Sequence, residues 1–417
     1  MNNTFGNYTG YVTLTFSFLT LFLSKAGINI SYILLIFFTL YCYFLHNPIR
    51  PPEYHLRKIT NLGMLLYGLG IIAMLFSSSI LQDTAWFARK GAFLLLLTPL
   101  FYLIIKHTNT AFISLLTGAT IAIGYSMTQY GFWSFQERIS SYWDIGRWSE
   151  LLSYLIAFLL PIAHASKERC HNLSTALHTW LILIIIFSIA ALISSGSRGP
   201  ILFLAITISI YLIFTNIKYF IYFIAIASIG IFLINASDEY HTVYERLASI
   251  FSQSNNSNNA RWLMYENGIN FIKYNFENDF VTFLLGTGSH NIASLQIEYL
   301  TMPSIESMQE SVGHQLSLTD FHNAYIDNYV KMGAIFSTGY LAFIVYLFLF
   351  FIQRAKSGSK YAWSGINLIL VYQGIGTVYS NSLEFQTSVF FFILSIALVW
   401  CTKEESTNLT SKYNESK

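Results

Sequence analysis

Residues 181–200 read LILIIIFSIAALISSGSRGP, an apolar run that ends in small residues and a single arginine, Arg198. An apolar run of about twenty residues is long enough to cross a bilayer as a helix. The run lacks the strict alternation of a membrane β-strand, and a helix satisfies its own backbone hydrogen bonds in lipid. The stretch therefore predicts a membrane-spanning helix that stops at a polar corner.

The composition extends this interpretation to the whole chain of 417 residues, of which 54% are hydrophobic and only 11% are charged. Soluble proteins carry about a quarter charged residues, so a set of soluble domains is excluded. Further apolar runs separated by polar segments predict an all-α integral membrane protein with about twelve spans. The predicted spans are residues 9–24, 28–46, 59–80, 89–106, 110–129, 149–165, 177–194, 200–216, 219–235, 325–352, 361–380 and 385–402.

The distribution of positive charge predicts how the chain is oriented. With the N-terminus in the cytoplasm, the short cytoplasmic loops and the C-terminal tail hold more than half of the 23 Lys and Arg residues, as the positive-inside rule requires. Residues 1–235 are then expected to form nine spans and residues 236–324 one large outer loop with amphipathic helices. Residues 325–402 form three more spans, and residues 403–417 are a cytoplasmic tail.

Several kinds of chemistry are not expected. The three cysteines, Cys42, Cys170 and Cys401, are too few and too scattered for a disulfide framework or a zinc site. The chain has no HExxH motif and no GxxxxGK[ST] phosphate-binding loop, so neither a metal nor ATP is expected. We predict no cofactor and no nucleic-acid partner.

Arg198 is expected to lie in a tight corner between two spans. The preceding helix should end near Ser194 or Ser195, with Gly196 in the left-handed conformation that closes a helix. Pro200 suits the first turn of the next helix, whose free N–H groups then lie beside the guanidinium. This combination predicts an anion site that fits a phosphate; the alternative is an arginine that reaches lipid headgroups.

The second candidate, Arg261, stands in NNARWLMYENGINFIKYNF, residues 258–276 of the large loop. The spacing predicts an amphipathic helix, capped by Asn258 or Asn259, with Arg261 in its first turn. Its apolar positions are Trp262, Tyr265, Ile269, Ile272 and Phe276, a face that would lie on the membrane surface or cap the bundle. The alternative is an exposed arginine on a surface helix.

The third candidate, His322, stands in SLTDFHNAYIDNYVKMGAIFSTG, residues 317–339, where the large loop enters a span. Thr319 is expected to cap the helix, which would place His322 in the first turn. A histidine at that point is suited to act as a general base near neutral pH. The alternative is a hydrogen-bonded structural histidine, the interpretation we give to His241, His290 and His314.

These three segments together resemble the superfamily of O-antigen ligases and O-antigen polymerases. The resemblance rests on SGSRG at residues 195–199, on Arg261 and Trp262 before the GTG of residues 286–288, and on the ligase pattern of His322-Asn323, nine residues and then Gly333. The chain departs from the pattern at Phe336, where a second small residue is often found.

The resemblance implies a fold similar to that of the C-type membrane glycosyltransferases. It implies transfer of O-antigen polysaccharide from undecaprenyl diphosphate to lipid A–core oligosaccharide, a step of lipopolysaccharide biosynthesis. The expected location is the bacterial inner membrane, with both termini in the cytoplasm and the active site facing the periplasm. The oligomeric state is left open.

The same resemblance assigns roles to residues in a metal-independent, inverting transfer. Arg198 and Arg261 would bind the diphosphate, and His322 would take the proton of the acceptor hydroxyl or orient that hydroxyl. Asn323, Lys273 and Tyr325 are further candidates. Expected partners are the undecaprenyl diphosphate-linked O-antigen, the lipid A–core oligosaccharide and membrane lipids.

Two alternatives remain at this point. An O-antigen polymerase uses the same lipid-linked donor but a second lipid-linked glycan as acceptor. A polysaccharide or lipid transporter would also suit many spans, but transporters tend to show related halves and charges near the midplane of the membrane. Here the candidate residues are predicted to gather on one side.

Overall fold

The computed structural model describes residues 2–45, 49, 51, 53–129, 138–169, 175–235, 256–299, 317–380 and 382–415. Within these ranges the chain is all-helical and contains no strand. The first group of helices is α1 (Asn2–Thr20), α2 (Lys25–Phe44), α3 (Tyr54–Leu75), α4 (Ile80–Lys90), α5 (Ala92–Leu95), α6 (Leu97–Lys106) and α7 (Thr108–Gln129). The second group is α8 (Ile145–Arg169), α9 (Thr175–Ser195), α10 (Arg198–Thr215) and α11 (Ile217–Asn235). The remaining helices are α13 (Asn256–Asn278), α14 (Phe280–Leu285), α15 (Ile292–Tyr299), α17 (Ala324–Lys356), α18 (Ala362–Gly376) and α19 (Phe385–Glu415).

The predicted all-α membrane fold is confirmed. Eight helices in the described part of the chain are long and apolar enough to cross a membrane, namely α2, α3, α7, α8, α9, α10, α17 and α19. The other predicted spans fall on α1, on α4 to α6, on α11 and on α18. The predicted single span 89–106 is divided among α4, α5 and α6, with breaks at Gly91 and Leu96.

The long helices form a bundle around α19 and α8. In α19, 89% of the residues in the apolar window are buried, whereas in α10 only 22% are. Peripheral helices such as α2 expose large apolar side chains, including Ile33 and Phe37. Such a surface suits contact with lipid tails, because apolar patches of this extent are rare on monomeric soluble proteins.

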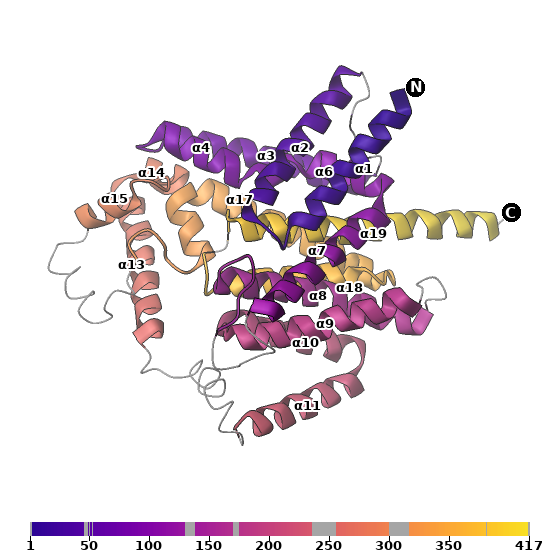
Figure 1. The fold of residues 1–417 in the computed structure, drawn as a ribbon. Helices are drawn as coiled ribbons and strands as arrows, with labels where there is room; N and C mark the ends of the chain where they lie inside the picture. The colour runs from indigo at the N-terminus through magenta and orange to yellow at the C-terminus, as the bar shows by residue number, and fades with distance from the viewer. Residues whose placement is uncertain are drawn as a thin grey trace.

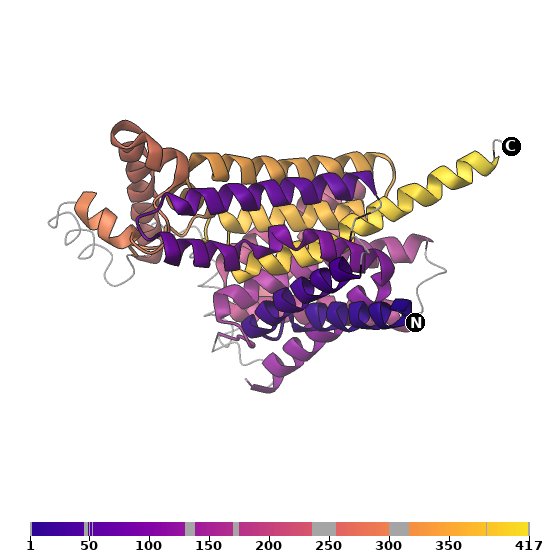
Figure 2. The same cartoon turned by 90° about the horizontal axis from the view of Figure 1, so that it is seen from above.

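Helices α13, α14 and α15 form a lobe at one end of the bundle. Figures 1 and 2 show α13 running across the bundle end, whereas α3, α17 and α18 run along the bundle axis. The N-terminal end of α1 and the C-terminal end of α19 both lie at the opposite end (Figures 1 and 2). We refer to α13, α14 and α15 as the lobe, and to the bundle end beside them as the lobe end.

A break in α17 joins the lobe to the bundle. Gly333 has φ +75° inside this helix, so the carbonyls of Val330 and Lys331 lose their helical partners. The backbone N–H groups of Thr287 and Gly288 donate to these two carbonyls at 2.9 and 3.0 Å. The 286–290 turn thus replaces the missing helical hydrogen bonds, and it can approach so closely only because glycines face each other.

The register of α13 corrects the predicted amphipathic face. The buried positions are Ala260, Met264, Asn267, Gly268, Phe271 and Asn275. Of the predicted apolar face, Trp262, Ile269 and Phe276 are exposed. The buried face of α13 is therefore smaller and more polar than the hydrophobic pattern predicts. At its centre Gly268, which has no side chain, lies directly against Phe321 and Ile326.

Replacing Gly333 by Ala is expected to destabilise the protein. The added Cβ would lie 2.4 Å from the backbone nitrogen of Gly286 and 2.4 Å from the carbonyl oxygen of Leu284. A left-handed alanine alone costs on the order of 1–3 kcal/mol. The measurement is the apparent melting temperature of the purified protein in detergent. Gly124→Ala is the control, because that helical glycine has no atom near its would-be Cβ and should keep or slightly raise the melting temperature. A Gly333→Ala protein as stable as the wild type would contradict this account.

Candidate active site

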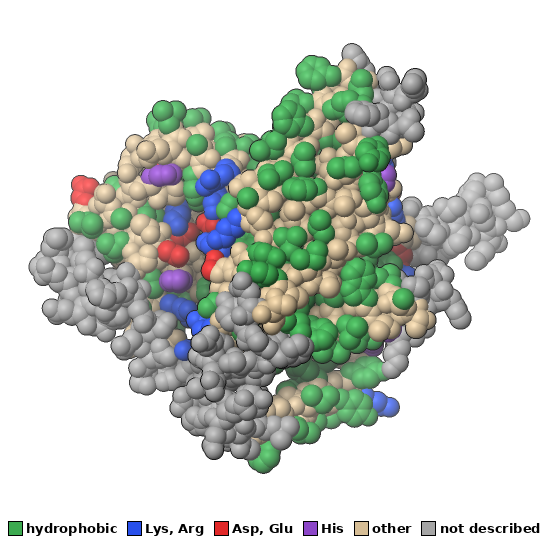
Figure 3. All heavy atoms as spheres, viewed as in Figure 1, with side chains coloured by type: hydrophobic (Ala, Val, Ile, Leu, Met, Phe, Trp, Pro, Cys, Tyr) green, Lys and Arg blue, Asp and Glu red, His purple; other side chains and the backbone are tan. Residues whose placement is uncertain are grey.

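A cavity of about 610 Å³ opens at the lobe end of the bundle, and we call it the charged cavity. Acidic, basic and imidazole side chains dominate its wall, and Figure 3 shows such side chains gathered along the boundary between lobe and bundle. Its lining residues are Trp86, Asp144, Gly146, Arg147, Glu150, Ser289, His290, Asp320, His322, Asp327, Lys331, Tyr379, Ser380, Ser382, Glu384 and Gln386.

Several helices begin at this cavity. Gly146 and Arg147 belong to the first turn of α8, His322 lies two residues before the start of α17, and Gln386 lies in the first turn of α19. A helix N-terminus carries partial positive charge, which favours an anion, although Asp144 already accepts from the N–H of Arg147 in α8. The bundle therefore supplies a positive field at the lobe end in addition to its charged side chains.

Arg198 occupies the corner that the sequence predicts. Helix α9 ends at Ser195, Gly196 has φ +62°, and α10 begins at Arg198 itself. The neighbouring Gly199 packs against Tyr379, where a Cβ would lie 3.0 Å from the ring. A further arginine holds this corner, since Arg138 donates from Nε to the carbonyl oxygen of Ser195 at 2.9 Å.

Arg261 reaches the same tyrosine from the lobe. Its guanidinium carbon lies 5.6 Å from the centre of the Tyr379 ring, over the ring face. The charges of Arg138, Arg198 and Arg261 all act on the Tyr379 hydroxyl, as does the carboxylate of Glu150. Arg198 and Arg261, distant in the sequence, thus both act electrostatically on one side chain in the wall of the charged cavity, and Arg261 also lies over its ring.

The predicted place of Arg261 in its helix was wrong. Helix α13 already includes Asn256, so Arg261 lies in the second turn, where its own N–H is no longer free. One turn further on, the hydroxyl of Tyr265 donates to the carbonyl oxygens of His322 at 3.2 Å and Thr377 at 3.1 Å. These two bonds fix the arginine-bearing face of α13 against the histidine loop.

His322 lies just before α17 rather than in its first turn, which corrects the predicted cap. The N-cap is Asn323, not Thr319, and its side-chain oxygen accepts from the N–H groups of Tyr325 and Ile326. Asn323 also donates to the carbonyl of Thr377 at 3.1 Å, so it has a structural role in holding the loop. His322 itself has φ +46°, a strained conformation for a non-glycine residue.

Asp320 completes the surroundings of His322. One carboxylate oxygen accepts from the backbone N–H of His322 at 2.7 Å and from the hydroxyl of Ser380 at 2.5 Å. Burial lowers the pKa of His322 below its usual value; the charge of Asp320 raises it in part, and that of Arg261 lowers it. The imidazole is therefore neutral near pH 7, the state that can accept a proton. The sequence offered one signal for Asp320, its position two residues before His322.

Ion pairs that the motifs did not identify line another wall of the cavity. Lys90 and Glu384 form a close salt bridge, and Arg147 lies 2.8 Å from Asp144 and 4.0 Å from Glu384. On α17, Lys331 pairs with Asp327 at 2.7 Å. The pairs Arg147–Asp144 and Lys331–Asp327 are three and four residues apart, a spacing that the sequence shows, whereas Glu384 meets Lys90 and Arg147 only through packing.

His290 also faces the charged cavity, and its partner is Asp83 on α4. The Asp83 carboxylate is buried and accepts from Nδ1 of His290 at 2.7 Å and from the backbone N–H groups of Ser289 and His290. The predicted hydrogen-bonded structural role of His290 agrees with this contact. Asp83 thereby holds the 286–290 turn against α4. His241 and His314 lie outside the described residues.

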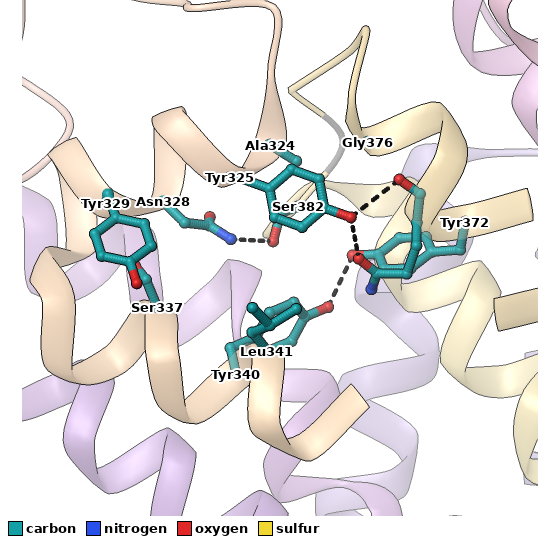
Figure 4. Close-up of a pocket in the computed structure, with 11 residues that line it drawn as sticks. Ala324, Tyr325, Asn328, Tyr329, Ser337, Tyr340, Leu341, Tyr372, Gly376 and Ser382 are labelled. Carbon is teal, nitrogen blue, oxygen red and sulfur yellow. Dashed lines mark hydrogen bonds between the residues drawn. The ribbon is translucent and has the colours of Figure 1, made fainter. Parts of the chain in front are cut away.

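Two further candidates lie apart from the arginines and His322. Lys273 is exposed on α13 and lies 3.9 Å from Glu277. Tyr325 points into a small pocket between α17 and α18, where its hydroxyl donates to the side-chain oxygen of Gln373 at 2.5 Å. Figure 4 shows this pocket, in which Asn328 donates to Ser382, a residue that also lines the charged cavity.

The pKa of His322 can be tested through its two charged neighbours. Asp320→Asn removes a negative charge that favours the imidazolium, so the pKa of His322 should fall further. Arg261→Gln removes a positive charge that disfavours the imidazolium, so the pKa should rise. Diethyl pyrocarbonate attacks the neutral ring. Compared with the wild type, modification of His322 should therefore begin at a lower pH in Asp320→Asn and at a higher pH in Arg261→Gln.

The readout is the mass of the peptide that contains His322, measured across a pH series. His55, which packs on Phe350 away from the charged cavity, is the internal control and should keep one profile in all three proteins. Shifts in the same direction in both variants would contradict the proposed electrostatics.

Comparison with known proteins supports the sequence motifs. Residues 183–335 match the family model described as O-antigen ligase, and this segment includes Arg198, Arg261, His322 and the 286–290 turn. No curated protein matches the chain. The match supports a multi-pass membrane protein with a function of the O-antigen ligase and polymerase type. The superfamily predicted from the three motifs, that of the O-antigen ligases and polymerases, is thus confirmed by the family match over residues 183–335.

Proposed function

We propose that the protein is an O-antigen ligase that transfers O-antigen polysaccharide from undecaprenyl diphosphate to lipid A–core oligosaccharide. The observation that carries this proposal is that Arg261 lies over Tyr379 while the charges of Arg261 and Arg198 both act on that tyrosine, in the wall of the cavity that His322 lines. The reaction would take place at the periplasmic face of the bacterial inner membrane. That face corresponds to the lobe end, opposite both termini.

The two arginines suit the leaving group of such a reaction. When the bond between the anomeric carbon and the phosphate oxygen breaks, negative charge grows on the lipid diphosphate. Arg198 and Arg261 provide planar guanidinium donors for phosphate oxygens, and Arg198 stands at the N-terminus of α10, where the helix dipole favours negative charge. Because these groups are fixed before the reaction, they stabilise the developing charge without reorganising.

His322 suits the acceptor side. Its neutral imidazole would take the proton of the core hydroxyl while that oxygen forms a bond to the anomeric carbon. Attack from the face opposite the diphosphate inverts the anomeric centre. The donor already contains an activated glycosyl bond, so the reaction needs no nucleotide.

The ligase is preferred to the polymerase because of the pattern formed by His322, Asn323 and Gly333. In the structure these residues supply the neutral imidazole, the cap of α17 and the break that receives the 286–290 turn. The family match covers both activities, so the acceptor has to be tested directly.

Replacing Arg198, Arg261 or His322 by Ala is expected to lower transfer to lipid A–core by at least about a hundredfold. Each change removes either charge stabilisation of the departing diphosphate or the proton acceptor. The measurement is the rate of glycan transfer by purified protein in nanodiscs. Arg198→Lys should retain part of the activity, because a lysine keeps the charge but not the paired donors.

The control is Lys218→Ala, an exposed basic residue at the start of α11, which should leave the rate unchanged. Normal transfer by Arg198→Ala or His322→Ala protein at wild-type abundance would overturn the assignment. Given both the lipid-linked O-antigen and lipid A–core, a ligase glycosylates the core. Growth of the glycan on the undecaprenyl carrier alone would instead identify a polymerase.

A further inference from the structure

A second cavity, of about 420 Å³, lies in the lobe, and we call it the lobe cleft. Its size is within the range of small-molecule sites, roughly 300–1,000 Å³. Helices α13, α14 and α15 and the segment after α3 form its walls. The lining residues are Phe76, Ser77, Ser78, Phe271, Tyr274, Asn275, Asn278, Asp279, Thr282, Gly286, Thr287, Leu295, Glu298 and Tyr299.

Aromatic side chains and uncharged polar side chains together form most of the lining of the lobe cleft. Tyr274 and Tyr299 lie with ring centres 4.8 Å apart, and Phe271 packs on Tyr299 at 5.7 Å. Among these residues Asn275 and Thr287 are buried, whereas Phe76 is exposed. A pyranose ring has an apolar C–H face and an edge of hydroxyl groups, so it matches a wall that combines aromatic rings with amides and hydroxyls.

The charges of the lobe cleft are opposite to what a phosphate requires. Its described lining residues include two carboxylates, Asp279 and Glu298, and no lysine or arginine. Hydrogen bonds from the hydroxyl and N–H of Thr282 hold the pKa of Asp279 below its usual value, so it stays ionised. Carboxylates accept hydrogen bonds from sugar hydroxyls but repel phosphate groups. The lobe cleft therefore favours uncharged sugars, whereas the charged cavity has two basic side chains, Arg147 and Lys331, among its five carboxylates.

The two cavities share one wall. Gly286 and Thr287 line the lobe cleft, whereas Ser289 and His290, at the end of the same turn, line the charged cavity. The turn is fixed from both sides, by α17 through Val330 and Lys331 and by α4 through Asp83. At this wall only the 286–290 turn separates the two cavities, so a glycan that extends out of the charged cavity here would enter the lobe cleft.

We propose that the lobe cleft is a saccharide-binding subsite that takes uncharged sugar residues of a glycan whose reacting end lies in the charged cavity. This inference rests on the proposed function for the nature of the substrate, and its own support is the aromatic and amide lining beside the shared wall. The glycan belongs either to the core acceptor or to the O-antigen donor. Both present the same chemistry, neutral pyranose rings, and the test separates them.

The test uses the full-length protein in nanodiscs and isothermal titration calorimetry. One probe is lipid-free, dephosphorylated core oligosaccharide, and the other is a lipid-free oligosaccharide of O-antigen repeats. The wild type should bind at least one of them. Tyr274→Ala, which removes a stacking ring, should raise the Kd of that probe at least about tenfold, and Glu298→Gln should raise it less. The matched control is Phe276→Ala, an exposed aromatic residue of α13 that does not line the cleft and should leave the Kd unchanged.

The kinetic counterpart separates binding from chemistry. In the transfer reaction, Tyr274→Ala should raise the KM of the substrate that contains the binding probe and leave kcat unchanged. Binding of neither probe, or a Kd that Tyr274→Ala and Glu298→Gln leave unchanged, would overturn the subsite and leave the ligase assignment standing. Conversely, oligosaccharide binding is measured without turnover, so the subsite can be established even if transfer to the core fails.

Discussion

The hydrogen bonds between the 286–290 turn and the broken part of α17 are the interaction on which the rest of the structure depends. A membrane helix cannot leave backbone carbonyls without partners at low cost, because lipid supplies none. The N–H groups of Thr287 and Gly288 meet this need and, in doing so, seat the lobe on the bundle. The position of the lobe decides where Arg261 lies, and Arg261 in turn faces Tyr379 and influences His322.

Charge is distributed unevenly about this joint. On the bundle side, the charged cavity has two basic side chains, Arg147 and Lys331, among five carboxylates, of which Asp144 and Asp327 pair with them. On the lobe side, the cleft has carboxylates and aromatic rings but no basic side chain among its described lining residues. A substrate made of a lipid diphosphate and a neutral glycan has the same division within one molecule. The proposed function and the proposed subsite thus rest on one electrostatic pattern.

The sequence predicted much of the fold, because hydropathy and helix length are local properties. The membrane class, the corner at Arg198 and the left-handed Gly196 all follow from residues close together in the chain. The division of residues 89–106 into three helices did not follow from hydropathy, since every piece is apolar. Thr319 is the cap expected from the sequence; in the structure Asn323 takes this place, and its side-chain amide also donates to the carbonyl of Thr377.

The candidate site was predictable only in part, for a related reason. His322, Arg198 and Arg261 could be chosen from their local settings, but Tyr379, on which the charges of both arginines act, carries no local signal. Asp83 and His290 are likewise joined only by the path of the chain through the fold.

The joint between the 286–290 turn and α17 consists of backbone atoms and of glycines facing each other. Apart from the Thr287 hydroxyl, which also donates to the carbonyl of Val330, this joint uses no side chain, so a new Cβ at Gly286 or Gly333 is the change that most directly obstructs it. The lobe surface can therefore diversify through random substitution while the arginines keep their positions. Sensitivity to substitution is thus concentrated in a few glycines, and this leaves the rest of the lobe free to vary.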